Sequence, residues 1–376
     1  MDQKANVKNN FFRLLTIKLV LVIVAVLSFF TLLGCPKGGE AGTETQKRVE
    51  WKIAQTWGPT LPVFNNPAEQ IAESVSKMSG GNFTISIDHA SKHKAPLGVL
   101  DFVTSGQYEM AHSASYYWKG KAPLTLYFTT MPFGMNAVEQ YAWFYEGGGM
   151  ELMEEVYEPL GVLSFPGGNT GVQMGGWFRK KIEKVDDLKG LKMRIPGFAG
   201  EVLSELGANI VNIPPGELYV ALERGTLDAL EWVGPSLDFA LGFHKIAQYY
   251  YTGWHEPATE LQFLVNRDAF EELPDTYKEM LRVAMRMAAY DMYITSYHES
   301  AVNWEKMKKE FPNIQVLTFP EPVMNAIRGA NDKLLKDFSE QDAMAAKIIK
   351  SQQDYAKQVR VWTDISEYSY ISSVKE

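Results

Sequence analysis

One segment constrains the fold more than any other: from Pro274 to Lys309 the chain has no glycine or proline after its first residue. This composition predicts a single uninterrupted helix. At 1.5 Å per residue, roughly 36 residues extend about 54 Å, which is longer than one small domain is wide. We therefore expect a long helix that spans two lobes and connects them.

Strand-like and helix-like segments alternate through most of the remaining chain. The strand VEWKIAQTW begins near Val49, and the helix after it is expected to start at Asn66, with an N-cap, a proline and an acid in its first turn. Further strands are expected at 171–178, 192–195, 210–213 and 229–233, with helices at 198–207 and 216–224 between them. Such alternation predicts an α/β fold rich in parallel strands.

The first 34 residues are typical of a signal peptide. Four basic residues precede an apolar run at 19–33, which has the length of a signal h-region. The run ends in LLGC, which resembles a bacterial lipobox and makes Cys35 the expected lipidation site. Leu33 fits the position before Gly34 imperfectly, so ordinary cleavage and a retained membrane helix remain alternatives. We expect a periplasmic or otherwise extracytoplasmic protein that is tethered to a membrane.

The cysteine and charge counts narrow the function. Cys35 is the only cysteine, so the chain has no intramolecular disulfide and no other thiol for catalysis or metal binding. Removing the four basic residues and one acidic residue of the leader leaves 33 basic and 44 acidic residues. A net charge of this sign argues against nucleic acid as a partner. An anionic ligand would need a local binding device, because the global field repels it.

The domain organisation follows from these patterns. After the signal peptide (1–34), residues 35–48 form a polar, glycine-rich tether, and residues 49–376 form a two-lobed region. We expect lobe I at about 49–170 with part of the C-terminal region, and lobe II at about 171–265. Helices at about 322–360 follow the spanning helix of 274–309, and they either present a solvated face or pack on a second subunit in a homodimer.

Signatures of enzymes are scarce in this sequence. It has no Gly-x-Ser-x-Gly elbow, no phosphate-binding Gly-x-x-x-x-Gly-Lys loop and no paired histidines around a glutamate on a helix. His89 and His93 are four residues apart, but they directly follow a strand and a proline comes soon after. A metal-chelating helix is therefore not expected there, and the composition favours a binding function.

Two charged residues stand at the ends of apolar strands. Arg194 ends the strand in LKMRIPG, where α/β folds place ligand-binding side chains, and its planar guanidinium fits a carboxylate bidentately. An ordinary ion pair between elements would explain this arginine equally well. Glu231 ends the strand in TLDALEWVGP and needs a partner, because an unpaired buried charge is costly. A cation, a metal ion or solvent at a cleft would each provide one.

Oxygen donors near these two residues suggest a cation site. Hard cations prefer carboxylate, amide and main-chain carbonyl oxygens. The Glu231 carboxylate, the Trp232 carbonyl and the Gln173 amide supply such a set, although Gln173 also fits an exposed strand position. A ligand carboxylate beside Glu231 would be repelled unless a cation lay between them or Arg194 outweighed the repulsion. The pattern is consistent with an anion held by Arg194 and bridged through a cation to Glu231.

Three segments resemble the solute-binding subunits of TRAP transporters of the DctP type. These segments are GNTGVQMGGWFRK, DLKGLKMRIPGFAGEVLSELGANIVNIPPGELYVALERGTLDALEWVGP and LGFHKIAQYYY. Within the family they are similar to the subgroup that binds 2-oxo or 2-hydroxy monocarboxylates. The resemblance implies two α/β lobes with crossing hinge strands and a long spanning helix. It also implies membrane subunits that receive a small organic anion, such as pyruvate or lactate.

The resemblance assigns roles to individual residues. Arg194 matches the family's carboxylate-binding arginine, and Gln173 matches an amide that touches both ligand and cation. Glu231 and the Trp232 carbonyl match the site of a bound sodium or calcium ion. The resemblance also implies a further metal ligand at Glu256, and aromatic pocket walls at Trp57 and at Tyr116 or Tyr117.

Three rival functions stay open at this level. The same pocket would serve the binding protein of an ATP-driven importer, although the long helix and the middle motif favour the TRAP type. A metal-dependent lyase would need an acid or base in the pocket, for which Glu231 and His255 are the candidates. A structural lipoprotein would bind no ligand.

Overall fold

The computed structural model describes residues 47–374. The predicted signal peptide, the predicted lipidation site Cys35 and nearly all of the predicted tether lie outside the described residues. Between residues 47 and 374, no helix is both long and apolar enough to cross a membrane.

A five-stranded sheet forms the first lobe, in the order β2-β1-β3-β10-β4. Its strands are β1 (Val49–Gln55), β2 (Phe83–Asp88), β3 (Met110–Ser113), β4 (Val162–Asn169) and β10 (Glu260–Asn266). β1 pairs in parallel with β2 and β3, whereas β10 pairs antiparallel with both β3 and β4. β3 is buried on both faces, and β10 is buried in all but its last residue, as expected for central strands between helical layers.

A six-stranded sheet forms the second lobe, in the order β11-β9-β5-β8-β6-β7. Its strands are short: β5 (Gly176–Phe178), β6 (Lys192–Arg194), β7 (Asn209–Val211), β8 (Ala229–Leu230), β9 (Tyr249–Tyr251) and β11 (Gln315–Leu317). β6 runs parallel to β7 and β8, and β5 runs antiparallel to β8 and β9. The carboxyl ends of β6 and β8 therefore meet at one edge of this sheet.

The first lobe has six helices among the described residues, and the start of the first one differs from the sequence prediction. They are α2 (Pro62–Met78), α3 (Ala90–His93), α4 (Val99–Thr104), α5 (Ala137–Glu146), α6 (Gly149–Tyr157) and α10 (Arg267–Glu271). The predicted start of α2 at Asn66 is wrong, since Pro62 takes the first helical position and Pro67 lies inside the helix. Asn66-Pro67 and Leu61-Pro62 both offer a proline at a helix start, and the chain uses the earlier one.

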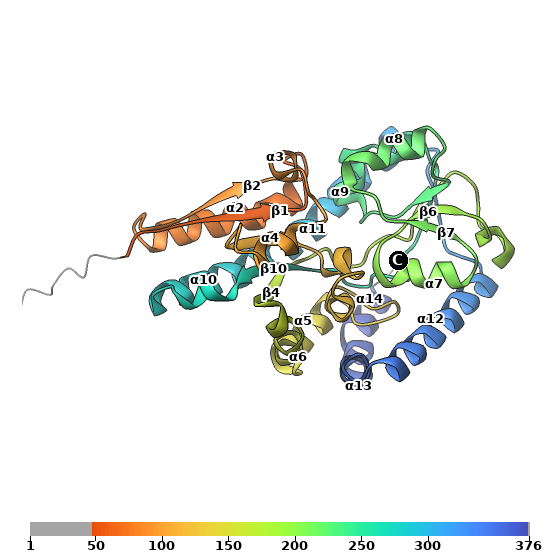
Figure 1. Ribbon diagram of the computed structural model, residues 1–376. Helices are drawn as coiled ribbons and strands as arrows, with labels where there is room; N and C mark the ends of the chain where they lie inside the picture. Colours follow the sequence, from red (N-terminus) through yellow and green to blue (C-terminus); the bar gives the residue numbers. More distant parts are fainter. Residues whose placement is uncertain (1–46, 375–376) are drawn as a thin grey trace, which may run out of the picture. The chain divides into compact units, whose positions relative to one another are not determined.

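The second lobe carries α7 (Gly197–Glu205), α8 (Leu218–Glu223) and α9 (Pro235–Leu241). The long helix α11 (Asp275–Glu310) contacts α2 and β4 of the first lobe and α9 of the second (Figure 1). This element confirms the predicted spanning helix, and the two sheets confirm the predicted two-lobed α/β fold.

The C-terminal region consists of several helices. α12 (Glu321–Gln341) and α13 (Ala343–Thr363) are separated at Asp342, whose side chain accepts hydrogen bonds from the backbone N–H groups of Met344 and Ala345. A π-helical turn, η7 (Asp364–Tyr368), then leads into α14 (Ser369–Ser373). The helical region thus extends thirteen residues beyond the predicted end at 360.

Two extended connections cross between the sheets. Residues 170–175 link β4 to β5, and residues 252–259 link β9 to β10. They run side by side through the hydrogen bonds Thr170 N to Thr259 O (3.1 Å) and Gln173 N to Glu256 O (2.9 Å). The predicted strand at 171–178 is thus a strand only at its end, and β10, placed in lobe II by the sequence boundary at 265, lies in the sheet of lobe I.

Candidate functional site

Arg194 is the last residue of β6, and its side chain is 1% exposed. Its Nη1 donates a hydrogen bond to the Glu231 carbonyl oxygen at 2.8 Å and lies 3.5 Å from the carboxylate atom Oε2 of the same residue. Its Nε and Nη2 are buried and have no hydrogen-bond partner. Buried guanidinium donors are costly to leave unpaired, so Nε and Nη2 are available to bind an acceptor on a ligand.

Glu231 directly follows β8 and is completely buried. Its backbone N–H donates to the Arg194 carbonyl at 2.9 Å, which fixes the two side chains at the same sheet edge. Burial raises the pKa of Glu231 well above its usual value; the Arg194 charge opposes this shift and the Asp238 charge adds to it. The carboxylate atom Oε1 has no hydrogen-bond partner, although His255 Nε2 lies 3.5 Å away.

A second carboxylate comes from the connection between β9 and β10. Glu256 is buried, and its Oε2 accepts a hydrogen bond from the Thr259 hydroxyl. Burial, followed by the Glu231 charge, raises the pKa of Glu256 to about 7. Single ligand atoms from Glu231, His255 and Glu256 all lie within 4.8 Å of one another. Two acids so close in a buried place favour a shared positive charge.

Gln173 lies on the other crossing connection, with its amide held in one orientation. Its Nε2 donates to the hydroxyls of Thr170 (3.0 Å) and Thr259 (2.9 Å), so both amide hydrogens are used. The amide oxygen is buried and has no partner. The two crossing chains approach closely, because a Cβ atom on Gly253 would lie only 1.9 Å from the Gln173 carbonyl oxygen.

Aromatic side chains cover this group of polar atoms. The Arg194 guanidinium lies 5.1 Å from the ring centre of Trp232, which packs edge-on against Phe64, and Phe64 in turn contacts Trp57. The indole N–H groups of Trp57 and Trp232 are both buried without a partner. The two predicted aromatic residues from opposite lobes therefore lie in one cluster beside Arg194.

The tyrosine pair in the 3₁₀ turn Ser115–Trp118 also borders the site. The rings of Tyr116 and Tyr117 pack edge to face, with centres 4.8 Å apart. Burial raises the pKa of Tyr116 well above its usual value, and Tyr117, Glu256 and Glu231 add to the shift. Burial also raises the pKa of Tyr117, whereas the nearby Arg194 charge lowers it. Both alternatives of the sequence prediction thus lie within electrostatic reach of the carboxylates.

The structure brings all the sequence-predicted ligand and cation residues together and adds others. His255 was predicted only as an acid-base group of a rival enzyme, yet it is buried beside Glu231 and neither ring nitrogen has a hydrogen-bond partner. Thr170 and Thr259, which orient Gln173, carry no sequence signal, because threonines in extended segments are common. The orientation of Gln173 depends on which segments cross, and only the fold shows this.

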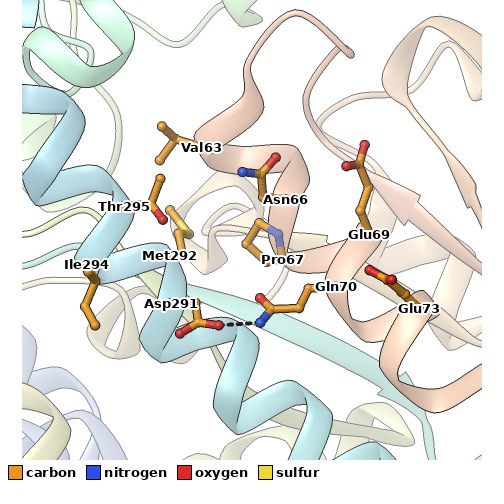
Figure 2. A pocket seen from close by; sticks show the side chains of 10 residues that line it. All are labelled: Val63, Asn66, Pro67, Glu69, Gln70, Glu73, Asp291, Met292, Ile294 and Thr295. Carbon is orange, nitrogen blue, oxygen red and sulfur yellow. Dashed lines mark hydrogen bonds between the residues drawn. The ribbon is translucent and has the colours of Figure 1, made fainter. Parts of the chain in front are cut away.

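The candidate site is sealed from solvent, since Arg194, Glu231 and Glu256 are each at most 1% exposed. The open cavities lie elsewhere. One of about 510 Å³ lies between α2 and α11. Figure 2 shows Glu69 and Gln70 of α2 in this cavity, with Gln70 hydrogen-bonded to Asp291 of α11. The residues that line this outer groove include no arginine or histidine, so the buried cluster is the better candidate for an anion site.

The donor set of the buried cluster fits a hard cation. The carboxylates of Glu231 and Glu256 and the amide oxygen of Gln173 are oxygen ligands, the type that sodium and calcium prefer. Two of these oxygens, Glu231 Oε1 and Gln173 Oε1, are buried without a hydrogen-bond donor. The arrangement has the groups that recognition of a small anion requires, namely an arginine fork and oxygen ligands for a cation.

Comparisons with known proteins show the family of this chain. The family model DctP, described as bacterial extracellular solute-binding protein, family 7, matches residues 53–342. The chain is 40% identical over 324 residues to a monocarboxylate 2-oxoacid-binding periplasmic protein of Nostoc sp., covering 86% of this chain and 88% of that protein.

Two solved structures are closer in sequence. A TRAP periplasmic solute-binding protein from Pseudoalteromonas atlantica, with bound sodium and pyruvate, is 62% identical, has a TM-score of 0.86 and covers 88% of this chain and 100% of that chain. One from Colwellia psychrerythraea, with bound calcium and pyruvate, is 61% identical, has a TM-score of 0.86 and covers 87% and 100%.

The family model and the relatives define an extracytoplasmic binding protein rather than an enzyme. The chain belongs to family 7 of the bacterial extracellular solute-binding proteins, the DctP family of TRAP transporters. Its relatives are transport proteins, so the lyase, the structural lipoprotein and the ATP-driven importer are set aside.

Proposed function

We propose that this protein captures pyruvate or a similar small 2-oxo or 2-hydroxy monocarboxylate for a TRAP transporter. Arg194 binds the ligand carboxylate through Nε and Nη2, and a sodium or calcium ion bridges the ligand to Glu231. The observation that carries the proposal is the pair of buried guanidinium donors without a partner. They are fixed by the bond from Nη1 to the Glu231 carbonyl, which leaves the other edge of the fork for a ligand.

The cation would be held by oxygens from three parts of the chain. Glu231 and the Trp232 carbonyl come from the end of β8, and Gln173 and Glu256 come from the two crossing connections. In this role the cation offsets the repulsion between the ligand carboxylate and the two buried acids. The relatives solved with pyruvate contain sodium in one case and calcium in the other, which supports either ion.

Binding residues from both lobes imply a closing motion. Trp57, Tyr116 and Tyr117 belong to the first lobe, whereas Arg194 and Trp232 belong to the second. A ligand held between them stabilises the closed arrangement, and residues 170–175 and 252–259 are the connections that must bend. The sealed site described above corresponds to the closed state.

Thermal denaturation of the chain from residue 49 onward tests the ligand class. We expect pyruvate to raise the melting temperature by mass action, and to raise it less after cations are removed by chelation and dialysis. Lactate and 2-oxobutyrate serve as close analogues, and succinate and glucose as controls. A shift with succinate or glucose alone would contradict the proposal, and a pyruvate shift that does not depend on any cation would remove the cation from it.

We also propose the membrane arrangement predicted from the sequence. After cleavage of residues 1–34, a lipid on Cys35 would anchor the protein, and residues 35–48 would act as a flexible tether that lets it reach the membrane subunits of its transporter. Fractionation of cells that produce the full chain, compared with its Cys35→Ser variant, tests the anchor.

A homodimer is supported by two exposed apolar faces. On α11, five apolar side chains that are 48–72% exposed follow a spacing of four and three residues: Val283, Met287, Tyr290, Ile294 and Tyr297. We call these residues the α11 face. A second set, 52–68% exposed, lies on the C-terminal helices and is called the C-terminal face: Val361, Trp362, Ile365, Tyr368, Ile371 and Val374. Alternation of four and three is the spacing of a helix–helix seam.

The end of the chain lacks packing of its own. No side chain between residues 364 and 374 is buried. This stretch continues α13 without a break, and most of the stability of a helix in a protein comes from packing of its apolar face. A two-fold axis would place the C-terminal face of each copy on the α11 face of the other, so that every contact occurs twice. Buried aromatic side chains contribute about 150–250 Å² each. With four aromatic residues in the two faces, the contact reaches the order of 800 Å² per partner that stable interfaces need.

Light scattering on the purified mature chain tests the dimer. We expect a dimer for the wild type and a monomer for Ile365→Glu and for Tyr290→Glu, because each places a charge in the apolar contact. Val138→Glu is the matched control, since Val138 is equally exposed but lies on α5. A monomeric wild type, or an Ile365→Glu variant that remains dimeric, would contradict the arrangement.

A further inference from the structure

Asp238, on α9, is a buried acid close to the candidate cation site, and both of its carboxylate oxygens are fully used. Its Oδ1 accepts hydrogen bonds from the backbone N–H groups of Val233 (3.2 Å) and Gly234 (3.0 Å). Its Oδ2 accepts from Trp177 Nε1 (2.8 Å) and from the Tyr250 hydroxyl (2.9 Å). The side chain is 1% exposed, so none of these bonds competes with bulk water.

The two donors to Oδ2 tie Asp238 to the core of the second sheet. Trp177 belongs to β5 and Tyr250 to β9, and their rings stack with centres 3.8 Å apart. The two donors to Oδ1 belong to the loop that follows Glu231. The carboxylate therefore connects the loop at residues 232–234 to the sheet by hydrogen bonds and holds the loop in place.

Because the peptide bond is planar, the hydrogen bond from Val233 N–H to Asp238 also orients the Trp232 carbonyl. The Val233 N–H and the Trp232 C=O belong to one trans peptide unit, in which they point in opposite directions. When Asp238 holds the N–H, the Trp232 carbonyl is directed away from Asp238 and cannot rotate freely. The next carbonyl, that of Val233, accepts a bond from Met174 N at 2.8 Å, which holds the loop from its other side.

The Trp232 carbonyl differs from its neighbours in one respect. The Glu231 carbonyl accepts from Arg194 and the Gly234 carbonyl accepts from Leu237 N and Asp238 N, whereas no donor among residues 47–374 bonds the Trp232 carbonyl. A buried loop with one unused carbonyl suggests an acceptor that is kept for another partner.

We propose that Asp238 is a positioning residue of the cation site, which fixes the Trp232–Val233 peptide so that the Trp232 carbonyl is presented to the cation. This inference rests on the proposed function, since it assigns a purpose to a carbonyl that the cation would use. Residues that orient metal ligands without touching the metal typically change its affinity by about 10- to 100-fold when they are replaced.

Asp238→Asn tests this role, because it keeps the size of the side chain and replaces one acceptor oxygen by an N–H donor. We expect its calcium affinity, measured by competition with a fluorescent chelator, to fall by at least about tenfold. Pyruvate affinity should fall at limiting calcium and recover at saturating calcium. Tyr250→Phe is the matched control: it removes one bond to Oδ2 and leaves both bonds to the loop, so its calcium affinity should stay within about threefold of the wild type.

A purely structural role would give a different pattern. Both variants would then lose thermal stability, and neither would change its calcium dependence. Wild-type calcium affinity in Asp238→Asn, or an equal loss in Tyr250→Phe, would overturn the inference while leaving the proposed function intact. Failure of the wild type to bind any cation would overturn the cation site and this inference together. If Asp238→Asn does not fold, Asp238→Glu, which keeps the charge but shifts the oxygens, should show the same loss of calcium affinity.

Discussion

Replacing Arg194 by alanine is expected to remove nearly all affinity for pyruvate. Removal of one partner from a buried, hydrogen-bonded charge pair costs about 2–5 kcal/mol. This cost corresponds to a roughly 30- to 4,000-fold increase in the dissociation constant. The two donors that lack a partner in the structure are the groups lost. Calorimetric titration with pyruvate at saturating calcium measures the change directly.

The variant should still fold. Burial keeps the pKa of Glu231 well above its usual value, so without Arg194 this acid takes up a proton rather than remain an unpaired charge. We therefore expect cooperative melting of Arg194→Ala, with no stabilisation by pyruvate.

Two further variants separate charge from geometry. Arg194→Lys keeps the positive charge but loses the planar fork, and it should bind pyruvate more weakly than the wild type and more tightly than Arg194→Ala. Arg179→Ala is the matched control, because Arg179 follows β5 in the same lobe and donates to the Leu222 carbonyl, away from the site. Tight pyruvate binding by Arg194→Ala would show that another group anchors the anion.

The sequence predicted the position of a site residue well where that position depends on a single strand. Arg194 and Glu231 are charged residues at the ends of apolar strands, and a local pattern is enough to place both at the carboxyl edge of a sheet. The helix at 275–310 could be predicted equally well, because such a length without glycine or proline is typical of one long helix.

The parts that escaped prediction depend on contacts between distant segments. β10 was placed with the second lobe by sequence order, yet it pairs with β3 and β4, more than 90 residues earlier in the chain. No local pattern encodes that pairing. The same crossing brings Glu256 to Gln173, so Glu256 could be proposed as a further cation ligand only from the family resemblance.

Asp238 shows a second kind of limit. An acid in the first turns of a helix normally signals a cap or a favourable interaction with the helix dipole at the surface. Here it is buried and joins a loop to two aromatic side chains, which are separated from it by 61 and 12 residues. Composition gives no means of distinguishing these two situations.

Calcium affinity is expected to rise with pH between about 6.5 and 8. In the ligand-free protein the pKa of Glu256 is raised to about 7 and burial also raises the pKa of Glu231 well above its usual value, so both acids bind protons more readily than exposed glutamates do. Calcium needs the carboxylates, so its binding releases these protons. Each proton released makes the affinity rise about tenfold per pH unit. Titration with a fluorescent calcium competitor at several pH values measures the slope.

The stability of the ligand-free protein should change in the opposite direction. An acid whose pKa is higher in the folded state than in the unfolded state stabilises the fold at low pH, and this contribution is lost as pH rises through the folded pKa. For Glu256 the loss extends from about pH 4.5 to about pH 7. Burial lowers the pKa of His255, whose contribution is complete above about pH 6.5, so measurements above that value report mainly on the acids.

Glu256→Gln identifies which acid is responsible. The amide has no acidic proton, so calcium binding should release about one proton fewer and the affinity should rise less steeply with pH. The affinity itself should be lower at pH 8, because one carboxylate charge is missing. The ligand-free variant should lose less stability than the wild type as the pH rises from about 4.5 to about 7. If calcium affinity is independent of pH in the wild type, then the two buried acids are already ionised without the cation, which would contradict this prediction.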